Sequence, residues 1–473
     1  MQYSVVMKSQ MNDEFRFDAE YFQPIYLHED EYVNEKTSKQ LGEIAFITDG
    51  QHGYHEVDES SDILHLTAKN AKTWFANKNN ADRIAKWVDD KNKRSSLCAG
   101  DIILSTRGSV GYCALVTKEV LPANIDQDVA RIVLLNDSYI NSSLLVAFLN
   151  SSYGQHWIKR NLSGMVQQGL PLSKVRKILI PKFGNEYKKA IDIITNIALL
   201  SNEKEKKLLT VADEILIKEL NIDKAKSFSE ITYVRSFSET LNAKRIDAEF
   251  FQPKYKYISD KIRLYNKGYE PAKKILQINN KNYVPTNMEY KYIELSDIGV
   301  NGEITGCTTN IGILLPSRAR RKIKNGDVII SSIEGSLNSI AYVDEEYENA
   351  ICSTGFYVVS SQYMNPETIL IFFKSIVGQM QLKQGCNGTI LTAINKEAFE
   401  NILIPKIAIE IQNKIKKMVQ AAFSERKKEF AILNIAKRSV KLCVEQGEEL
   451  AIKWIKSELD KIGVEFDAGS NKN

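Results

Sequence analysis

Apolar positions follow two different patterns along this chain. Short runs rich in β-branched residues, such as 102–104 (IIL) and 328–330 (VII), each follow a Gly-Asp turn signal and predict buried strands. Two longer stretches, residues 186–220 and 410–444, space their apolar positions in alternating steps of four and three. That spacing is typical of a coiled coil and predicts two long helices.

The two long helices share the layout of their seams. Both seams turn polar midway, at Ser201 and Glu205 and at Glu425 and Glu429. At 1.5 Å per residue, about 35 residues form a rod of roughly 50 Å. We expect the helices to pair antiparallel; two separate helices, each packed on its own domain, are the alternative. The seam of the first helix is Tyr187, Ile191, Ile194, Ala198, Ser201, Glu205, Leu208, Ala212 and Ile215. The seam of the second helix is Ile411, Ile415, Met418, Ala422, Glu425, Glu429, Ile432 and Ala436. The candidate partner-binding residues among them are Ile191, Ile194, Leu208, Ile415, Met418 and Ile432.

An internal repeat organises the chain. Residues 16–26 (RFDAEYFQPIY) recur as 245–255 (RIDAEFFQPKY), a shift of 229 positions. Later matches follow at slightly smaller shifts, namely 100–105 (GDIILS) with 326–331 (GDVIIS) and 178–181 (ILIP) with 402–405 (ILIP). A unit of this size exceeds a solenoid repeat and suits a duplicated domain.

Each copy predicts the same order of elements. A short strand-like opening (residues 3–7 and 231–235) precedes the repeated segment, and short helices are expected at 143–149 and 366–377. The fold class is therefore α+β, with two β-rich units, each followed by a long helix, in a pseudo-twofold repeat. A further helix at residues 448–462 follows the second long helix, and its role is unassigned.

Composition describes an ordinary foldable chain. It has 473 residues, of which 43% are hydrophobic and 26% charged, and no apolar run approaches the length of a membrane helix. The N-terminus lacks the pattern of a signal peptide. Six scattered cysteines without a Cys-x-x-Cys pair predict a reducing cytoplasm. A net charge of +4 neither indicates nor excludes a nucleic-acid binder, which needs only a basic face.

Motifs for catalysis are missing from the sequence. Gly-Lys does not occur, which excludes a P-loop, and neither a Gly-x-Ser-x-Gly elbow nor the Asn/Asp-Pro-Pro-aromatic segment of amino-methyltransferases is found. Glu205-Lys206-Lys207 fits half of a nuclease pattern but is interpreted as a solvated charge run on a helix. His52 and His55 could suit a metal, yet the matching stretch 280–285 holds no histidine, so we expect none.

Basic clusters precede the Gly-Asp turn in both copies. The denser one contributes Arg318, Arg320, Arg321 and Lys322, and the other contributes Lys93 and Arg94. Arg94 aligns with Arg320 at a shift of 226. Such a pair of clusters would suit one phosphate-contacting surface per copy; solvated turns are the alternative.

Polar glycine-containing loops are the candidate base readers. Arg107 lies in loop 106–111, and Gln167 and Gln168 lie in loop 163–169. Arginine and glutamine can read guanine and adenine through two hydrogen bonds, although these side chains could equally satisfy loop backbone. The matching loops of the second copy, 334–338 and 386–389, differ in content, as does the region 49–70. Similar flanking segments with different loops favour two recognition units that bind different base sequences.

The order of these features resembles the specificity subunits of type I restriction-modification enzymes over roughly residues 1–460. Two β-rich units, each preceded by Arg-x-Asp-Ala-Glu-aromatic-Phe and followed by a long helix, carry the resemblance. Residues 48–52 (TDGQH) also resemble an Asp-Gly-x-His stretch of that family. No single motif is specific, whereas their order and duplication are.

The resemblance implies a non-catalytic, cytoplasmic DNA-binding subunit. Its domains would be target-recognition domains at 1–182 and 243–406, a spacer helix at 183–222, a linker at 223–242, and a second spacer helix with a helical tail at 407–473. Each recognition domain would contact half of a bipartite site in double-stranded DNA. The paired helices would fix the length of the gap between the two half-sites. Two methyltransferase subunits would bring S-adenosylmethionine, and motor-nuclease subunits would use ATP and Mg²⁺; this chain would bind no cofactor.

Two alternatives stay open. One is the DNA-recognition subunit of a type II system whose nuclease and methyltransferase share another chain, which the partner's sequence would reveal. The other is a coiled-coil adaptor with two β-rich interaction domains and no DNA, which a filter-binding assay would separate.

Overall fold

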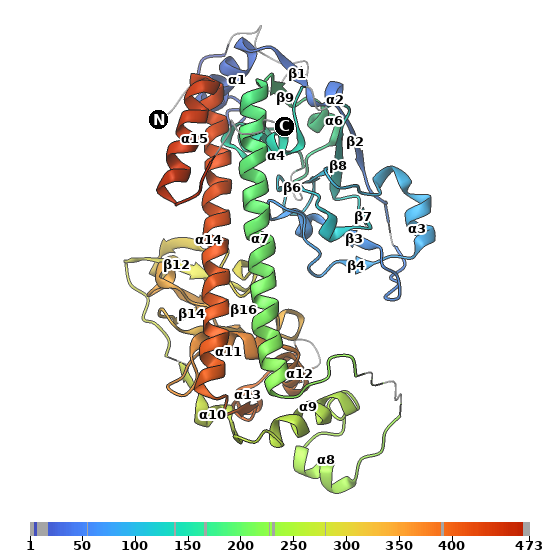
Figure 1. Ribbon diagram of the computed structural model, residues 1–473, viewed down its shortest axis with the longest axis vertical. Coiled ribbons are helices and arrows are strands. Elements are labelled where there is room, and N and C mark those ends of the chain that lie inside the picture. The colour runs from blue at the N-terminus through green and yellow to red at the C-terminus, as the bar shows by residue number, and fades with distance from the viewer. Residues whose placement is uncertain are drawn as a thin grey trace. The chain divides into compact units, whose positions relative to one another are not determined.

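The computed structural model divides into two compact units (Figure 1). Unit 1 comprises Met1–Asn202 and Arg426–Asn473, and unit 2 comprises Glu203–Glu425. Both mix helices with β-sheets, as expected of an α+β chain. The described residues are 4–6, 18–53, 55–136, 139–164, 168–226, 228, 232–279, 281–388 and 392–466.

Two sheets form the centre of unit 1. The larger has the antiparallel order β2-β8-β5-β6, and the smaller has the order β4-β3-β7 with β3 and β7 parallel. The apolar run predicted as a strand lies in β5, which is buried at every position. The strands are β1 (Ser38–Gln40), β2 (Ala45–Asp49), β3 (Leu64–Leu66), β4 (Asp82–Arg83), β5 (Ile102–Ser105), β6 (Cys113–Leu115), β7 (Ala123–Ile125), β8 (Val129–Leu134) and β9 (Leu179–Pro181).

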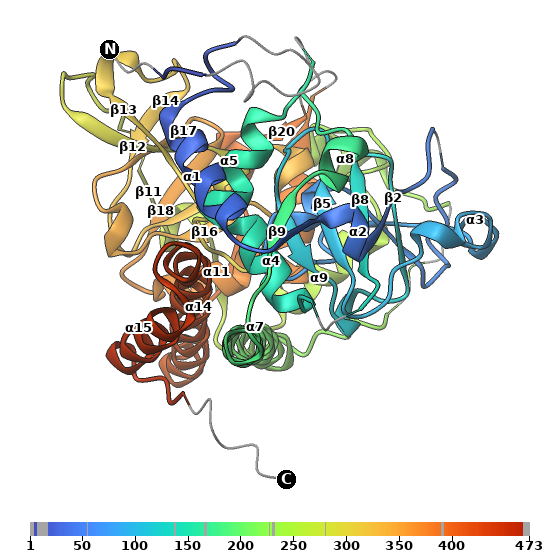
Figure 2. The ribbon, with the colours of Figure 1, turned by 90° about the horizontal axis from the view of Figure 1, so that it is seen from above.

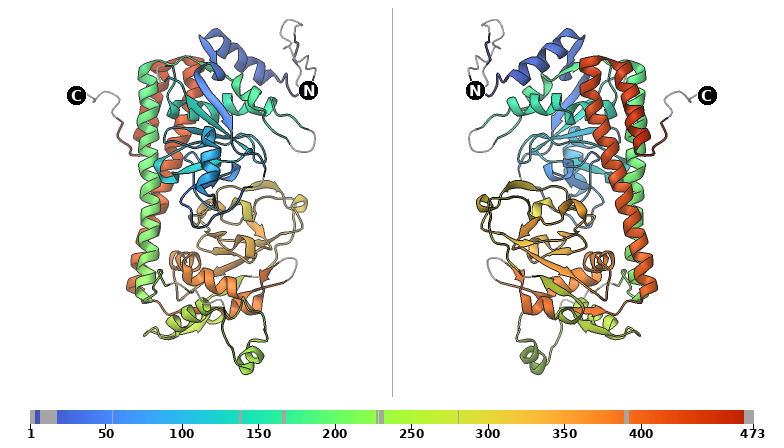
Figure 3. Two further views of the ribbon diagram at one scale, coloured as in Figure 1. Left: turned by 90° about the vertical axis from the view of Figure 1, so that its right-hand side faces the viewer. Right: turned by 90° about the vertical axis from the view of Figure 1, so that its left-hand side faces the viewer.

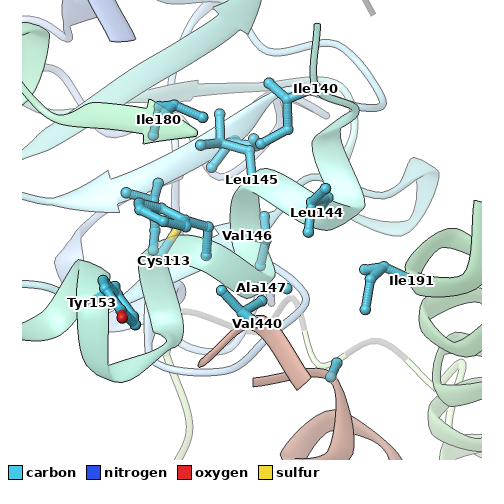
Figure 4. Close-up of a cluster of buried hydrophobic side chains, with 14 of the residues drawn as sticks. Cys113, Ile140, Leu144, Leu145, Val146, Ala147, Tyr153, Ile180, Ile191 and Val440 are labelled. Carbon is cyan, nitrogen blue, oxygen red and sulfur yellow. The ribbon is translucent and has the colours of Figure 1, made fainter. Parts of the chain in front are cut away.

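Strand β5 serves two cores because its side chains alternate between the faces of the sheet. Ile102 and Leu104 pack with helix α4, whereas Ile103 joins the core of the smaller sheet. Figure 4 shows Leu144 and Ala147 of α4 in the core that they share with Ile102 and Leu104. The helices of unit 1 are α1 (Pro24–Glu35), α2 (Leu41–Ile44), α3 (Lys86–Lys91), α4 (Ser142–Asn150), α5 (Ser152–Arg160), α6 (Leu172–Arg176), α15 (Glu448–Lys461) and parts of α7 (Asn185–Glu219) and α14 (Ile409–Gln446).

Unit 2 holds two four-stranded sheets (Figure 3). One has the order β11-β18-β15-β16 and the other the order β13-β12-β17-β14. Val328 and Ile330 of β15 join one core and Ile329 the other, as alternation requires. The strands are β10 (Tyr269–Pro271), β11 (Gln277–Asn279), β12 (Glu289–Ile293), β13 (Thr308–Ile311), β14 (Ala319–Lys322), β15 (Val328–Ser331), β16 (Ile340–Tyr342), β17 (Ile351–Ser353), β18 (Phe356–Ser360), β19 (Cys386–Asn387), β20 (Ala393–Ile394) and β21 (Leu403–Pro405).

Helices of unit 2 include the predicted helical stretch at 366–377, which is split into two. Helix α11 ends at Lys374 and α12 begins at Ile376, because the intervening Ser375 adopts an extended conformation. The stretch predicted at 143–149 is α4 of unit 1. The helices of unit 2 are α8 (Phe237–Ala243), α9 (Pro253–Arg263), α10 (Ala272–Ile275), α11 (Pro366–Lys374), α12 (Ile376–Gly385), α13 (Lys396–Glu400) and the remaining parts of α7 and α14.

The long helices α7 and α14 contact each other inside each unit. In unit 1, the Tyr187 hydroxyl lies 2.9 Å from the Ser439 hydroxyl, and the Asn202 side chain donates to Glu429 over 3.1 Å. The two segments therefore run in opposite directions there. In unit 2, Lys204 forms an ion pair with Glu425.

The buried stripe of these helices differs from the predicted seam toward its ends. Ile215 and Met418 are only half-buried, while their neighbours Leu216 and Val419 are fully buried. A straight helix has 3.6 residues per turn, so its buried stripe drifts away from a strict 3.5-residue repeat. The interpretation of Glu205 as solvated was wrong, because its side chain is buried and accepts a hydrogen bond from Asn301 over 3.2 Å.

An asparagine ties each sheet unit to its long helix. Asn141 caps α4 and donates to the Lys188 carbonyl of α7 over 3.3 Å. In unit 2, Asn365 caps α11 and donates to the Gln412 carbonyl of α14 over 3.2 Å. Each bond joins a short helix of the unit to the first turn of a long helix, so it helps to hold the long helix against that unit.

Helix α15 is the predicted additional helix, and it completes the core of unit 1. Its buried residues Ala451, Ile455 and Leu459 join the cluster that α7 and α14 also enter, and Figure 2 shows α14 and α15 end-on. The Glu448 carboxylate accepts a hydrogen bond from the Gly184 amide just before α7. A carboxylate at that position also complements the positive end of the helix dipole.

The predicted strand-like openings are not strands where the chain is described. Residues 4–6 and 232–235 have no strand assignment, and Val5 and Val234 are exposed by 78% and 92%. No strand in the described ranges pairs with either segment, so apolar character alone did not make them strands. Among the described residues, no helix has the length and apolar character needed to cross a bilayer.

Candidate nucleic-acid interface

Backbone hydrogen bonds join the two candidate reading loops of unit 1. The Leu170 amide donates to the Thr106 carbonyl over 2.8 Å, and Arg107 forms a β-bridge with Gly169. Ser163 and Gly169 exchange two further hydrogen bonds, which close the second loop. The sequence predicted that each loop could contact bases, but it did not predict that the two loops lie side by side. In the structure they are joined and form one surface.

Arg107 lies on this surface with half of its side chain exposed. Its guanidinium is 3.7 Å from the Asp128 carboxylate, and its amide donates to the Asp128 carbonyl over 3.3 Å. Burial raises the pKa of the nearby Asp126 carboxyl to about 6. A long, exposed ion pair contributes little stability, so Arg107 can exchange Asp128 for another acceptor.

The loop that carries Arg107 rests on a fixed frame. The Ser105 hydroxyl donates to the Ser109 carbonyl over 2.6 Å, and the Gln155 side chain donates to the Gly111 carbonyl over 2.9 Å. These bonds satisfy backbone carbonyls of the turn and leave the side chains at its tip available for contacts with a ligand.

Unit 2 joins its corresponding loops in a similar way. The Ile394 amide donates to the Ser332 carbonyl over 2.9 Å, and the Glu334 amide donates to the Thr392 carbonyl over 3.0 Å. A Lys383–Glu334 ion pair occupies the loop surface and lowers the pKa of the Glu334 carboxyl. Unit 1 thus presents a half-exposed arginine beside Asp128, whereas unit 2 presents a lysine paired with Glu334, so the two surfaces carry different side chains.

The repeated Arg-x-Asp-Ala-Glu segment supports a candidate reading loop in unit 2. Arg245 pairs with Asp247 over 2.7 Å and donates to the carbonyls of Gln384 and Cys386 over 3.2 and 2.9 Å. It therefore holds the start of the loop that includes Gly388. The equivalent Arg16 of the first copy lies outside the described residues, but Asp18 accepts from the Tyr21 amide over 3.0 Å, as Asp247 does from Phe250.

The basic run of unit 2 lies on an outer strand, whose backbone the segment 282–283 bridges at Arg321 and Arg320. Arg318 precedes β14, and Arg320 and Lys322 lie on it with exposed side chains, while Arg321 is half-buried. Strand β14 is an outer strand of its four-stranded sheet. Within the described residues no ion pair is found for Arg318, Arg320 or Lys322, so these three charges can meet an anion.

The basic pair of unit 1 differs from that strand. Lys93 and Arg94 lie in a 3-10 turn, Lys93–Ser95, rather than on a strand. Lys93 pairs with Asp89 over 2.8 Å and with Asp90, and its hydrogen bond with Asp89 raises the pKa of its ammonium group. Arg94 and Arg320 therefore align in sequence but lie on different surfaces, because carboxylates pair with both cations of unit 1: those of α3 with Lys93, and Asp49 of β2 with Arg94.

Arg94 stabilises the Asp-Gly-Gln-His stretch. It lies 3.2 Å from the Asp49 carboxylate and donates to the Thr48 hydroxyl over 3.2 Å. Gly50 is required there, since a Cβ at this position would lie 1.8 Å from the Ile125 carbonyl oxygen. His52 contacts Asp49 over 2.9 Å, and in the described part of the chain no group of three or more potential metal ligands converges.

Of the two glutamines in the second loop, Gln167 lies outside the described residues, and Gln168 is exposed, as a base-reading side chain must be. The candidate partner-binding residues have a different setting from the one expected. Leu208 and Met418 are half-buried. Four candidate partner-binding residues are completely buried by the chain itself, so another subunit cannot reach them; they are Ile191, Ile194, Ile415 and Ile432.

Sequence reasoning missed the residues that hold the loops in place. Asp128 (through its backbone carbonyl), Lys383 and Arg245 each fix a candidate reading loop through contacts between distant segments. Arg245 had a signal, since it belongs to the repeated segment. Asp128 and Lys383 had none, because their partners are defined only by the fold.

Comparison with known proteins finds matches among solved structures but none among family models or curated sequences. No protein-family model matches the chain, and no curated protein matches its sequence. The S subunit of a type I restriction-modification system from M. genitalium is 13% identical, with a TM-score of 0.36 over 89% of this chain and 95% of that chain. The HsdS subunit from Thermoanaerobacter tengcongensis is 11% identical, with a TM-score of 0.26 over 90% and 95% of the two chains. A structure concerned with complex assembly and conformational transition of the type I R-M system is 12% identical, with a TM-score of 0.26 over 89% and 96%.

Proposed function

We propose that this chain is the non-catalytic specificity subunit of a type I restriction-modification enzyme. Each unit would contact one half of a bipartite site in double-stranded DNA. The observation that carries the proposal is the joining of two polar loops into one surface in each unit, on similar frames but with different side chains. An exposed basic strand in unit 2 supplies the charge that phosphates require.

The recognition domains would be residues 1–182 and 243–406, and α7 and α14 would be the spacer between them. Their contacts in each unit favour an antiparallel coiled coil over two unrelated helices. Segments 183–222 and 407–473 would form this spacer with its helical tail, and 223–242 would be the linker. Inserting four residues beside Ser201 should then change the gap between the half-sites, and an unchanged gap would contradict the spacer role.

Partner subunits would supply the chemistry. Two methyltransferase subunits would bring S-adenosylmethionine to adenines, and motor-nuclease subunits would use ATP and Mg²⁺. Because most seam residues are buried, these partners would meet outward-facing side chains of the long helices. Leu200 and Phe430, which are 64% and 67% exposed, are the largest apolar candidates.

Selection from a random duplex library tests the proposal. The full chain, purified with its methyltransferase partner, should enrich a consensus of two short conserved parts separated by a gap of fixed length. Enrichment of no sequence, or of one uninterrupted motif, would overturn the two-reader proposal. Retention of a protein partner without any duplex binding would instead support the adaptor function.

A further inference from the structure

Unit 2 exposes a cluster of large apolar side chains beside its basic strand. Val284, Met288, Ile313 and Leu314 are 78%, 67%, 57% and 62% exposed. Folded proteins rarely gather exposed residues of this size without a binding role. We call these four residues the apolar tip.

Backbone hydrogen bonds bring the two segments of the apolar tip together. The Gly312 amide donates to the Met288 carbonyl over 2.8 Å, and the Ile313 amide donates to the Thr286 carbonyl over 3.1 Å. The segment 282–288 is also bonded to the basic strand, because the Tyr283 amide donates to the Arg320 carbonyl over 2.8 Å. The apolar tip and the basic strand thus belong to one corner of the unit.

The backbone of the apolar tip is held rigidly. The Tyr283 hydroxyl donates to the Gly312 carbonyl over 2.8 Å, and the Tyr283 and Tyr290 rings pack edge to face at 5.5 Å. A Cβ at Gly312 would lie 2.8 Å from the Thr286 carbonyl oxygen, so only glycine permits this close approach. A rigid apolar projection can deform a binding partner, whereas a flexible one would change its own conformation instead.

Charge around the apolar tip favours a polyanion as its partner. Residues 308–324 contain five basic residues and no acidic one, and residues 282–289 carry a single charge, that of Glu289, which lies opposite Ile311 in the sheet. An apolar surface made for another protein has no need of such a border. Duplex DNA presents phosphates outside and apolar base faces inside, which fits a basic strand beside an apolar projection.

We propose that Ile313 and Leu314 insert as a wedge against a base step in the minor groove at the half-site contacted by unit 2. Arg318, Arg320 and Lys322 would hold the flanking phosphates while the wedge unstacks the step and kinks the duplex. Specificity would then include how easily the step deforms, in addition to contacts with base edges. This inference rests on the proposed function, since it requires that unit 2 bind DNA.

The experiment uses the full chain with its methyltransferase partner and a duplex carrying its site. The fluorescent base 2-aminopurine replaces one adenine at a time across the half-site, because its emission rises when it unstacks. End-labelled duplexes report bending through energy transfer. The test variant is I313S/L314S, and L264S is the matched control, since Leu264 is 81% exposed elsewhere in unit 2.

Binding of the wild type should raise 2-aminopurine emission several-fold at one step and shorten the end-to-end distance. I313S/L314S should still bind the site, with an affinity reduced about tenfold or less, but should lose both signals. L264S should behave as the wild type. Thermal unfolding followed by circular dichroism should be similar for all three proteins, because the changed side chains are exposed.

Two results would overturn the wedge while leaving the proposed function intact. One is specific binding by the wild type without unstacking at any step, or with unstacking that I313S/L314S retains. The other is loss of the methyltransferase partner from I313S/L314S with unchanged DNA signals, which would make the apolar tip a protein-docking surface. If the wild type binds no duplex specifically, the proposed function itself fails.

Discussion

The Leu170 amide donates a hydrogen bond to the carbonyl oxygen of Thr106 over 2.8 Å, and this bond joins two loops that are far apart in the sequence. Arg107 follows Thr106 directly, so its side chain leaves the surface at the junction of the loops. Specific readers of DNA depend on such fixed starting points, since a loose side chain cannot discriminate between bases.

Arg107 is therefore expected to read one base pair. R107A should reduce discrimination at a single position of the site contacted by unit 1 by about 1–3 kcal/mol, while binding to unrelated DNA stays nearly constant. Competition filter binding with singly substituted duplexes measures this. R83A is the matched control, since Arg83 has a comparable 3.7 Å ion pair with Asp62 in the same unit. Equal losses on all duplexes would show a phosphate contact instead.

The cations of β14 should contribute to affinity without regard to sequence. Changing Arg318, Arg320 or Lys322 to alanine should each lower the slope of log K against log salt by about one. K93A should lower it by less than half as much, because Asp89 and Asp90 already pair with that ammonium group. Titrations at several salt concentrations compare them, and an equal effect of K93A and R320A would refute the distinction.

Much of the secondary structure could be predicted from the sequence, because it depends on local patterns of apolar residues. Continuous apolar runs after a Gly-Asp turn specified β5 and β15, and the steps of four and three specified α7 and α14. The settings of charged residues were not predictable in this way. Glu205 is buried because Asn301 reaches it, and Lys93 pairs with carboxylates of its own neighbourhood. Such pairings depend on tertiary contacts, which neither periodicity nor the internal repeat encodes.

Close packing at Gly50 gives a stability prediction. G50A should destabilise unit 1 by roughly 3 kcal/mol, since the added carbon meets the Ile125 carbonyl and the backbone must move. G53A is the control: Gly53 has a φ of +84° but open space around it, so its cost should be about 1 kcal/mol. All four tryptophans belong to unit 1, so urea unfolding followed by their fluorescence reports this unit. Equal costs would contradict the packing argument.

Acid should destabilise unit 1 through His65. Its ring is buried in β3 at 3.9 Å from the His55 ring, and burial lowers its pKa from 6.5 to about 4. Between these values the unfolded chain binds a proton that the folded chain does not, so stability falls as pH falls, by roughly 3 kcal/mol in total. Asp82, 3.6 Å from His55, opposes this effect only in part.

The variant H65Q isolates the contribution of His65. Its unfolding free energy, measured by tryptophan fluorescence, should depend less on pH between 6.5 and 4 than that of the wild type. Comparing the two profiles cancels Asp126, whose raised pKa acts in the opposite direction. H28Q should keep the wild-type profile, since His28 is exposed. Parallel profiles of H65Q and the wild type would exclude His65 as the acid-sensitive group.

Sequencing of methylated adenines after a domain exchange tests the two-reader account most directly. Residues 1–182 would be replaced by the matching domain of a relative with a different target, and the methylated sites of the host genome would be mapped. The account predicts a new sequence in one half of the site, with the other half and the gap unchanged. A change in both halves together, or methylation of the original sequence alone, would contradict it.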